Sequence, residues 1–362
     1  MRVRQMPGGR LTGRDIIVMG GSAGAVEGMS QIVAGLPADL PAAVFVVVHF
    51  PAYSTSVLPR ILTRSGHLRA VHPADGDPIE HGTIYVAPPD HHLLVERGRV
   101  RLSRGPRENG HRPSVDPLFR SAARAYGTRV TGVVITGNLD DGTAGLGAVR
   151  TMGGCAVVQD PEDALHPGMP TSALGMVGAD RMLPLHQISA ALVELATTPV
   201  PQQEPPVPER LATETGIAGM DPAALQGDER PGTPSGYSCP DCHGSLFEIN
   251  EGAVQRFRCR VGHAYSVETL LAHQGDAVES ALWTAMLALK ERAALSRKMA
   301  ERLRERGGER SAERFQQQAS EADVRAGVIQ NVLRNLGLAA GQEAERAVQL
   351  PDALEQLDRA GD

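Results

Sequence analysis

The stretch DIIVMGGSAGAVEG (residues 15–28) joins an apolar run to a glycine-rich turn and then to a helical pattern. Two further apolar runs, AAVFVVVHF (42–50) and VTGVVITG (130–137), are also followed by helical patterns. Near-continuous apolar strands that alternate with helices are typical of a parallel sheet covered on both faces. We therefore predict an α/β domain over residues 13–197, with a doubly wound, mostly parallel sheet.

The composition of the whole chain limits what the protein can be. Of 362 residues, 41% are hydrophobic and 22% charged, which is ordinary for a globular protein and argues against a wholly disordered chain. A formal net charge of −6 disfavours a general nucleic-acid binder. The longest apolar run, 42–48, is far below the ~20 residues of a membrane span, and the amino terminus has no apolar signal segment. We expect a cytoplasmic protein that binds no nucleic acid and inserts into no membrane.

Composition changes after residue 197. Residues 198–236 are rich in proline and lack a sustained apolar period, so we expect an extended linker that decouples the segments on either side. A compact cysteine-containing unit is predicted at 237–265. Residues 266–362 show apolar positions at three- and four-residue steps, interrupted at Gly307-Gly308 and at Gly341, which predicts three helices. This tail fits either a solvated antiparallel hairpin or a coiled coil that forms a homodimer.

The cysteine-containing unit carries two close pairs of metal ligands. Cys239 and Cys242 form a C-x-x-C pair, and Cys259 is followed four residues later by His263. Two such pairs separated by a short span suit tetrahedral Zn²⁺, and a unit this small would draw its stability from the metal. We expect a structural zinc. A redox C-x-x-C lacks its βαβ context here, and catalytic zinc is disfavoured because four ligands close the coordination shell.

Three polar side chains are expected at one edge of the sheet. Ser22 follows the first strand in a G-x-S-x-G turn, His49 ends the second strand, and the pair Asp140-Asp141 follows the strand at 130–137. Serine, histidine and aspartate supply a nucleophile, a general base and an orienting carboxylate, and strand carboxyl ends are where open α/β sheets bind ligands. Each residue alone has a simpler reading: a phosphate-binding turn, a core histidine or a helix cap.

The order and surroundings of these residues resemble a known family. Residues 15–195 are similar to the catalytic domain of the CheB protein-glutamate methylesterases, on these motifs in the family's order: IVMGGSAGAVEG, VVVHFP, YVAPPDHHL, GHRPSVDPLFR (110–120), VVITGNLDDGTAGL and Gly168-Met169-Pro170. The chain order Ser…His…Asp differs from the Ser…Asp…His order of α/β-hydrolases. Gly137-Asn138-Leu139 departs from the Gly-Met-Gly that is usual in the family. Only about fourteen residues precede the first strand, so we expect no receiver domain and no autoinhibition in cis.

The resemblance implies a reaction and its residues. Ser22 is the nucleophile, His49 the base and Asp141 the orienting aspartate, and no cofactor is needed for catalysis. The backbone amides of Ala23 and Asn138 are candidates for binding the oxyanion. Arg112 is a candidate substrate residue, and structural pairing explains it equally well. The implied partner is a methylated chemoreceptor-like protein, whose glutamyl methyl esters are hydrolysed and whose glutamines are candidates for deamidation.

Two other functions stay open on the sequence. The same fold could serve as an esterase for a regulatory protein outside chemotaxis. It could also act as a non-catalytic scaffold that binds a modified protein, although the intact Ser22, His49 and Asp141 set argues against a scaffold.

Overall fold

The computed structural model describes residues 13–50, 56–201, 205–226, 232–251 and 254–358. They divide into two compact units, Met1–Leu271 and Ala272–Asp362, each of which is considered by itself. Among the described residues, no helix combines the length and the apolar character that crossing a membrane requires.

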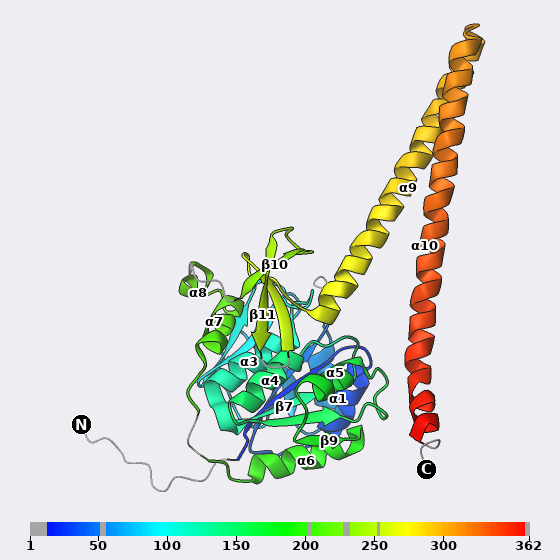
Figure 1. Cartoon of the computed structure of the whole chain (residues 1–362). Coiled ribbons are helices and arrows are strands. Elements are labelled where there is room, and N and C mark those ends of the chain that lie inside the picture. The colour runs from blue at the N-terminus through cyan, green and yellow to red at the C-terminus, as the bar shows by residue number, and fades with distance from the viewer. Residues whose placement is uncertain (1–12, 51–55, 202–204, 227–231, 252–253, 359–362) are drawn as a thin grey trace. The chain divides into compact units, whose positions relative to one another are not determined.

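The first unit is built on a seven-stranded sheet (Figure 1). Every pairing in this sheet is parallel, which confirms the predicted α/β class. Its order is β3-β4-β2-β1-β7-β8-β9, so β1 lies between β2 and β7. The strands are β1 (Ile16–Gly21), β2 (Ala43–Val48), β3 (Arg69–Val71), β4 (Thr83–Val86), β7 (Val130–Val134), β8 (Cys155–Gln159) and β9 (Arg181–Leu183).

Helices cover both faces of the sheet, as the apolar character of its strands requires. On one face α1 (Ala25–Ala34), α2 (Leu58–Ser65) and α6 (Leu185–Thr197) pack around Ile17, Val44 and Val46. On the other, α3 (Val115–Tyr126), α4 (Thr143–Thr151) and α5 (Gly168–Met176) pack around Val18 and Phe45. The hairpin of β5 (His92–Glu96) and β6 (Arg99–Ser103) joins this second core.

The prediction of an extended linker at 198–236 is wrong for part of that segment. Two helices form there, α7 (Glu209–Ala218) and α8 (Pro222–Gln226). Leu211 and Ile217 of α7 are buried, and Leu211 belongs to the second core. Pro208 sits immediately before α7, where a missing backbone N–H costs nothing, so proline here precedes a helix instead of preventing one.

The cysteine-containing unit forms a four-stranded antiparallel sheet of β10 (Thr233–Ser238), β11 (Ser245–Glu251), β12 (Val254–Cys259) and β13 (Ala264–Ser266). The antiparallel hairpin β11–β12 lies between the two ligand pairs. A small core that includes Leu246, Phe257 and Tyr265 packs against the cysteines.

The carboxyl-terminal segment contains two long helices, α9 (Val267–Glu305) and α10 (Glu309–Asp358), and not three. Gly307 ends the first with a φ of 74°, but Gly341 lies inside α10. A single glycine inside a helix costs about 1 kcal/mol, which a long helix tolerates. Within the second unit, Met286 packs with Ala326, and Ala293 with Ala319, as in an antiparallel pair of helices.

Candidate active site

The register of the sheet brings Ser22 and His49 together. Gly21 of β1 pairs with Val48 of β2, so the next residue of each strand leaves the sheet at the same edge. Strand β1 ends in two glycines. A Cβ at Gly20 would lie 2.2 Å from Val115 Cγ1, and a Cβ at Gly21 would lie 2.7 Å from Ala25 Cβ. Glycine is therefore required for the close approach of α1 and α3 to the turn that carries Ser22.

Ser22, His49 and Asp141 form a hydrogen-bonded row. Ser22 Oγ lies 3.1 Å from His49 Nδ1, and His49 Nε2 lies 2.7 Å from Asp141 Oδ2. Because an ionised carboxylate only accepts hydrogen bonds, Nε2 carries a proton and Nδ1 offers its lone pair to the Ser22 hydroxyl. This is the tautomer in which histidine acts as a base toward serine.

Asp141 is held by donors from the loop before α3 and from its first turn. Asn109 Nδ2 (2.9 Å) and Ser114 Oγ (2.8 Å) donate to Oδ1, and the backbone amide of Val115 donates to Oδ2 at 2.7 Å. Burial by itself raises the pKa of Asp141, but the hydrogen bonds from His49, Val115 and Asn109 outweigh it and leave the pKa well below its usual range. The carboxylate therefore stays ionised at the positive end of α3.

A second carboxyl group lies beside this row. Asp116 accepts hydrogen bonds from the Gly145 amide (2.6 Å) and from Asn109 Nδ2 (3.1 Å). Burial and the nearby charge of Asp141 raise the pKa of Asp116 to about 7.

The ring of His111 stacks on that of His49, with 3.8 Å between centroids and 9° between planes. It adds an aromatic support on the face of the base.

The remaining predicted site residues are placed differently. Asn138 is exposed at the sheet edge next to Leu139, whose φ is 59°. Arg112 donates from Nε and Nη2 to Asp90 Oδ1, at 2.9 and 2.5 Å, and from Nη1 to the carbonyls of Arg104 and Gly105. These contacts fit its structural reading. A cavity of about 460 Å³, lined by residues that include Ala144, Met176 and Leu211, has none of the row among its lining residues.

Sequence reasoning did not identify Asn109 or Ser114 as partners of Asp141. Ser114 lies inside the motif GHRPSVDPLFR, and Asn109 directly precedes it, so their place in the sequence was a usable signal. The orientation of their side chains toward Asp141 depends on how the loop before α3 folds, which no period or spacing reveals.

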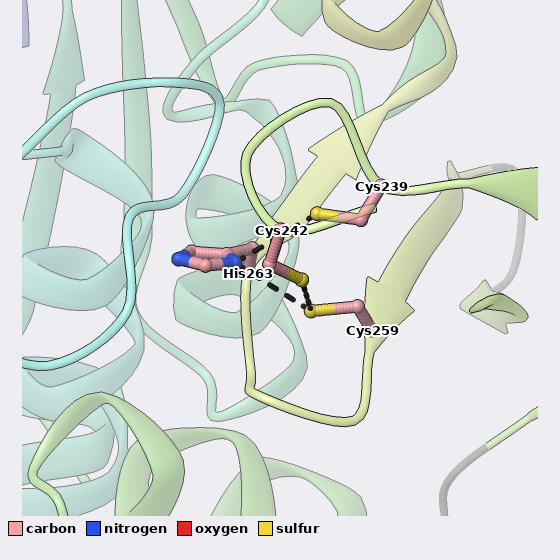
Figure 2. A group of neighbouring side chains, drawn as sticks. All are labelled: Cys239, Cys242, Cys259 and His263. Carbon is pink, nitrogen blue, oxygen red and sulfur yellow. Dashed lines mark hydrogen bonds between the residues drawn. The ribbon is translucent and has the colours of Figure 1, made fainter. Parts of the chain in front are cut away.

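The four predicted metal ligands come together (Figure 2). Cys239 Sγ and Cys259 Sγ lie 3.7 and 3.6 Å from His263 Nδ1, and Cys242 Sγ lies 3.6 Å from Cys259 Sγ. Tetrahedral Zn²⁺, with Zn–S bonds of about 2.3 Å and a Zn–N bond of about 2.0 Å, requires ligand atoms about 3.5–3.8 Å apart. The four ligand atoms all lie within 4.8 Å of one another, so the group can hold a metal ion, and the three distances given match those that tetrahedral coordination requires.

A family model described as CheB methylesterase matches residues 17–192, which contain the whole row. Residues 17–192 are a CheB methylesterase domain. The CheB methylesterase catalytic domain of Thermotoga maritima, a solved structure, is 34% identical and aligns over 98% of its own length and 50% of this chain, with a TM-score of 0.48.

Curated relatives match the same share of the chain. A protein-glutamate methylesterase/protein-glutamine glutaminase 2 of Methanosarcina mazei is 36% identical over 190 residues, which cover 50% of this chain and 52% of the relative. One of the same name from Pseudomonas aeruginosa is 38% identical, covering 51% and 54%. The chain thus spans about half the length of the curated relatives it matches.

Proposed function

We propose that this protein is a serine hydrolase that cleaves glutamyl methyl esters on a methylated chemoreceptor-like protein, giving glutamate and methanol. The observation that carries the proposal is the hydrogen-bonded row of Ser22, His49 and Asp141 at adjacent strand ends of a CheB methylesterase domain. The names of the relatives support the same activity and add deamidation of glutamine.

The reaction follows from the direction of the hydrogen bonds. His49 Nδ1 takes the proton of Ser22 as Oγ attacks the ester carbonyl, and Asp141 stabilises the imidazolium through Nε2–H. The backbone amides of Ala23 and Asn138 are our candidates for binding the oxyanion. His49 then gives its proton to the departing methoxide, which leaves as methanol. Water, deprotonated by His49, releases glutamate from Ser22. With a glutamine substrate the group that leaves is ammonia.

The test measures methanol released from a methylated receptor and ammonia released from its glutamine form. We expect the full-length protein to release at least methanol, and Ser22→Ala to release neither product. Ser30→Ala is the matched control, because Ser30 lies on α1 and its hydroxyl donates to the backbone carbonyl of Val26, one turn earlier in the same helix. Normal methanol release by Ser22→Ala would place the nucleophile elsewhere.

We also propose that Cys239, Cys242, Cys259 and His263 bind one structural Zn²⁺. All four cysteines of the chain are free thiols, which suits the reducing cytoplasm where we place the protein. Metal analysis of protein purified without added metal should find about one zinc per chain. A chain free of zinc that keeps its fold would contradict the assignment.

The helical unit is proposed to mediate a homodimer. Apolar side chains are exposed on both of its helices, among them Trp283, Leu287 and Leu295 on α9 and Val324 and Val328 on α10. Exposed apolar stripes of this kind mark interaction surfaces. Light scattering should give twice the mass of one chain, and Leu287→Glu should reduce it to one. A monomeric wild type would contradict the dimer.

A further inference from the structure

The loop 107–109 lies along the edge of strand β13 in the first unit. Asn109 N donates to the carbonyl of Ala264 at 2.7 Å, and Ala264 N donates to the carbonyl of Arg107 at 3.2 Å. Ala264 directly follows the metal ligand His263. The backbone of the cysteine-containing unit is thus hydrogen-bonded, as in a sheet, to the loop that supplies donors to Asp141.

The side chain of Asn109 joins the two sites. Its Oδ1 accepts a hydrogen bond from the backbone amide of Ser266 at 3.0 Å, while its Nδ2 donates to Asp141 and Asp116. In a side-chain amide only the oxygen can accept a hydrogen bond, so the backbone N–H of Ser266 determines the orientation of the Asn109 side chain. With Oδ1 bound to Ser266, Nδ2 must face the carboxyl groups of Asp141 and Asp116. The residue is 3% exposed, and its φ of 52° falls in the left-handed region that asparagine tolerates.

Asp140, which directly precedes Asp141 of the row, is also held by residues that follow the metal group. Asp140 Oδ1 accepts hydrogen bonds from Ser266 Oγ at 2.6 Å and from Thr269 Oγ1 at 3.0 Å. Asp140 and Asp141 are consecutive, so residues 266–269 restrain the backbone that carries the triad aspartate as well as its side-chain donor. These contacts are independent of the amide of Asn109.

A buried ionic cluster fixes the loop to strand β12. The carboxylate of Glu108 accepts from Arg256 and Arg258 of β12, both at 3.0 Å, and these arginines also bind Glu214 of α7. The side chains of Glu108 and Glu214 are 1% and 0% exposed. A charged network this deeply buried has little freedom to rearrange without losing partners.

From these contacts we propose that the Cys₃His unit is a positioning element for catalysis: by fixing residues 263–266 it orients Asn109, and Asn109 holds Asp141 in line with His49. Binding of a divalent cation that prefers thiolate and imidazole ligands, such as Zn²⁺, thereby controls the esterase. This inference rests on the proposed function, since Asp141 matters only if the row performs hydrolysis. Removal of the metal leaves β13 without its support, because a unit of this size owes its fold to the metal.

Asn109→Gly tests the connection without disturbing the metal ligands. Glycine removes the amide and accepts a positive φ, so the backbone is not strained. We expect kcat to fall about 10- to 100-fold, the effect of losing one hydrogen bond to a charged group, with KM little changed. With one donor fewer the pKa of Asp141 is less depressed, so activity is lost at a higher pH on acidification. Zinc content should stay near wild type, whereas Tm should fall by several degrees, because the buried Ser266 amide loses its acceptor.

Asn250→Gly is the matched control, since Asn250 lies on β11 and its exposed side chain donates to the carboxylate of Glu248 on the same strand. It should leave kcat and the pH profile unchanged. An Asn109→Gly variant with wild-type kcat and pH profile would overturn the proposal.

Chelation then tests the role of the metal. In wild type, removal of zinc should lower kcat by at least the factor seen in Asn109→Gly, and re-addition should restore it. In Asn109→Gly the same treatment should lower kcat by a smaller factor, because the hydrogen bond from Asn109 is already lost and only the restraint through Asp140 remains. Equal losses in both proteins, or no loss in wild type, would overturn the proposal.

A readout without substrate separates this proposal from the proposed function. The proton between His49 Nε2 and Asp141 gives a downfield NMR resonance that can be followed in the resting protein. We expect the resonance to shift or broaden on chelation and in Asn109→Gly, and to stay in Asn250→Gly. If the resonance responds as expected while the zinc-loaded protein hydrolyses no glutamyl ester, the proposed function is refuted but the link between the metal group and Asp141 is supported. If hydrolysis is normal and the resonance does not change on removal of zinc, only the link between the metal group and Asp141 is refuted.

Discussion

Replacement of Glu108 by glutamine tests whether the cysteine-containing unit and the parallel sheet share one buried core. The Glu108 carboxylate accepts from Arg120 at 2.6 and 2.7 Å, and from Arg256 and Arg258 at 3.0 Å each. Glutamine keeps the size of the side chain but removes the charge and turns one acceptor into a donor that faces a guanidinium group. Three buried arginines would then share the single carboxylate of Glu214.

The cost follows from the burial of this cluster. Removing one partner from a buried ionic group costs about 3–5 kcal/mol, because a charge stays buried without compensation. A unit of this size loses about 2–4 °C of Tm per kcal/mol, so we expect a decrease of about 6–20 °C. Differential scanning calorimetry on the full chain measures it. The sheet and the cysteine-containing unit should still melt in one transition.

Glu194→Gln is the control for this change. Glu194 pairs with Arg181, but its side chain is 59% exposed, so water and salt screen the pair and Tm should not move. A Glu108→Gln variant whose Tm falls by less than about 2 °C, or in which the two parts melt separately, would refute the shared core.

Three further predictions concern the sheet edge and the metal group. Gly137→Ala places a Cβ 2.2 Å from Met169 Sδ and 2.9 Å from Ser22 Cβ, so the serine should be displaced and kcat/KM should fall about 100-fold. Gly175→Ala is the control, because its Cβ would have nothing within 4 Å and kcat/KM should not change. Equal kcat/KM values for the two variants would refute the importance of the contact at Gly137. Burial raises the pKa of Asp140 to about 6, so between about pH 4 and 6 the folded protein keeps a proton that the unfolded chain loses, and the free energy of unfolding falls as the pH rises through this range. In urea titrations, the free energy of unfolding of Asp140→Asn should fall less over the same range. A pH dependence equal to that of wild type would show that Asp140 is not its cause. Cys242→Ser should abolish stoichiometric zinc in metal analysis while Cys155→Ser, a buried thiol outside the group, keeps it; zinc retained by both would exclude the Cys₃His site.

The sequence predicts the sheet and the row well because both depend on short-range patterns. Strand ends can be read from where an apolar run meets glycine, and parallel strands place their ends at one edge. The prediction needed only that β1 lie between β2 and β7, which the strand order confirms. The ligand pairs around Cys239 and Cys259 were equally local signals.

The contacts between segments could not be predicted in this way. Glu108 and Arg258 are 150 residues apart and belong to no periodic pattern. Proline-rich composition suggested an extended linker, yet Leu211 and Glu214 are buried because α7 packs against both the sheet domain and β12. The amide of Asn109 acquires its role only when the loop before α3 meets β13.

The most direct test of the central claim is to trap the acyl-enzyme. A peptide carrying a glutamyl methyl ester is mixed with the full-length protein, quenched within a turnover and analysed by mass spectrometry of the digested chain. We expect the glutamyl adduct on Ser22, its absence in Ser22→Ala, and slower formation in Asp141→Asn, in which the orienting carboxylate is lost. An adduct on another residue, or methanol release at the wild-type rate by Ser22→Ala, would contradict the assignment of Ser22, His49 and Asp141 as the catalytic row.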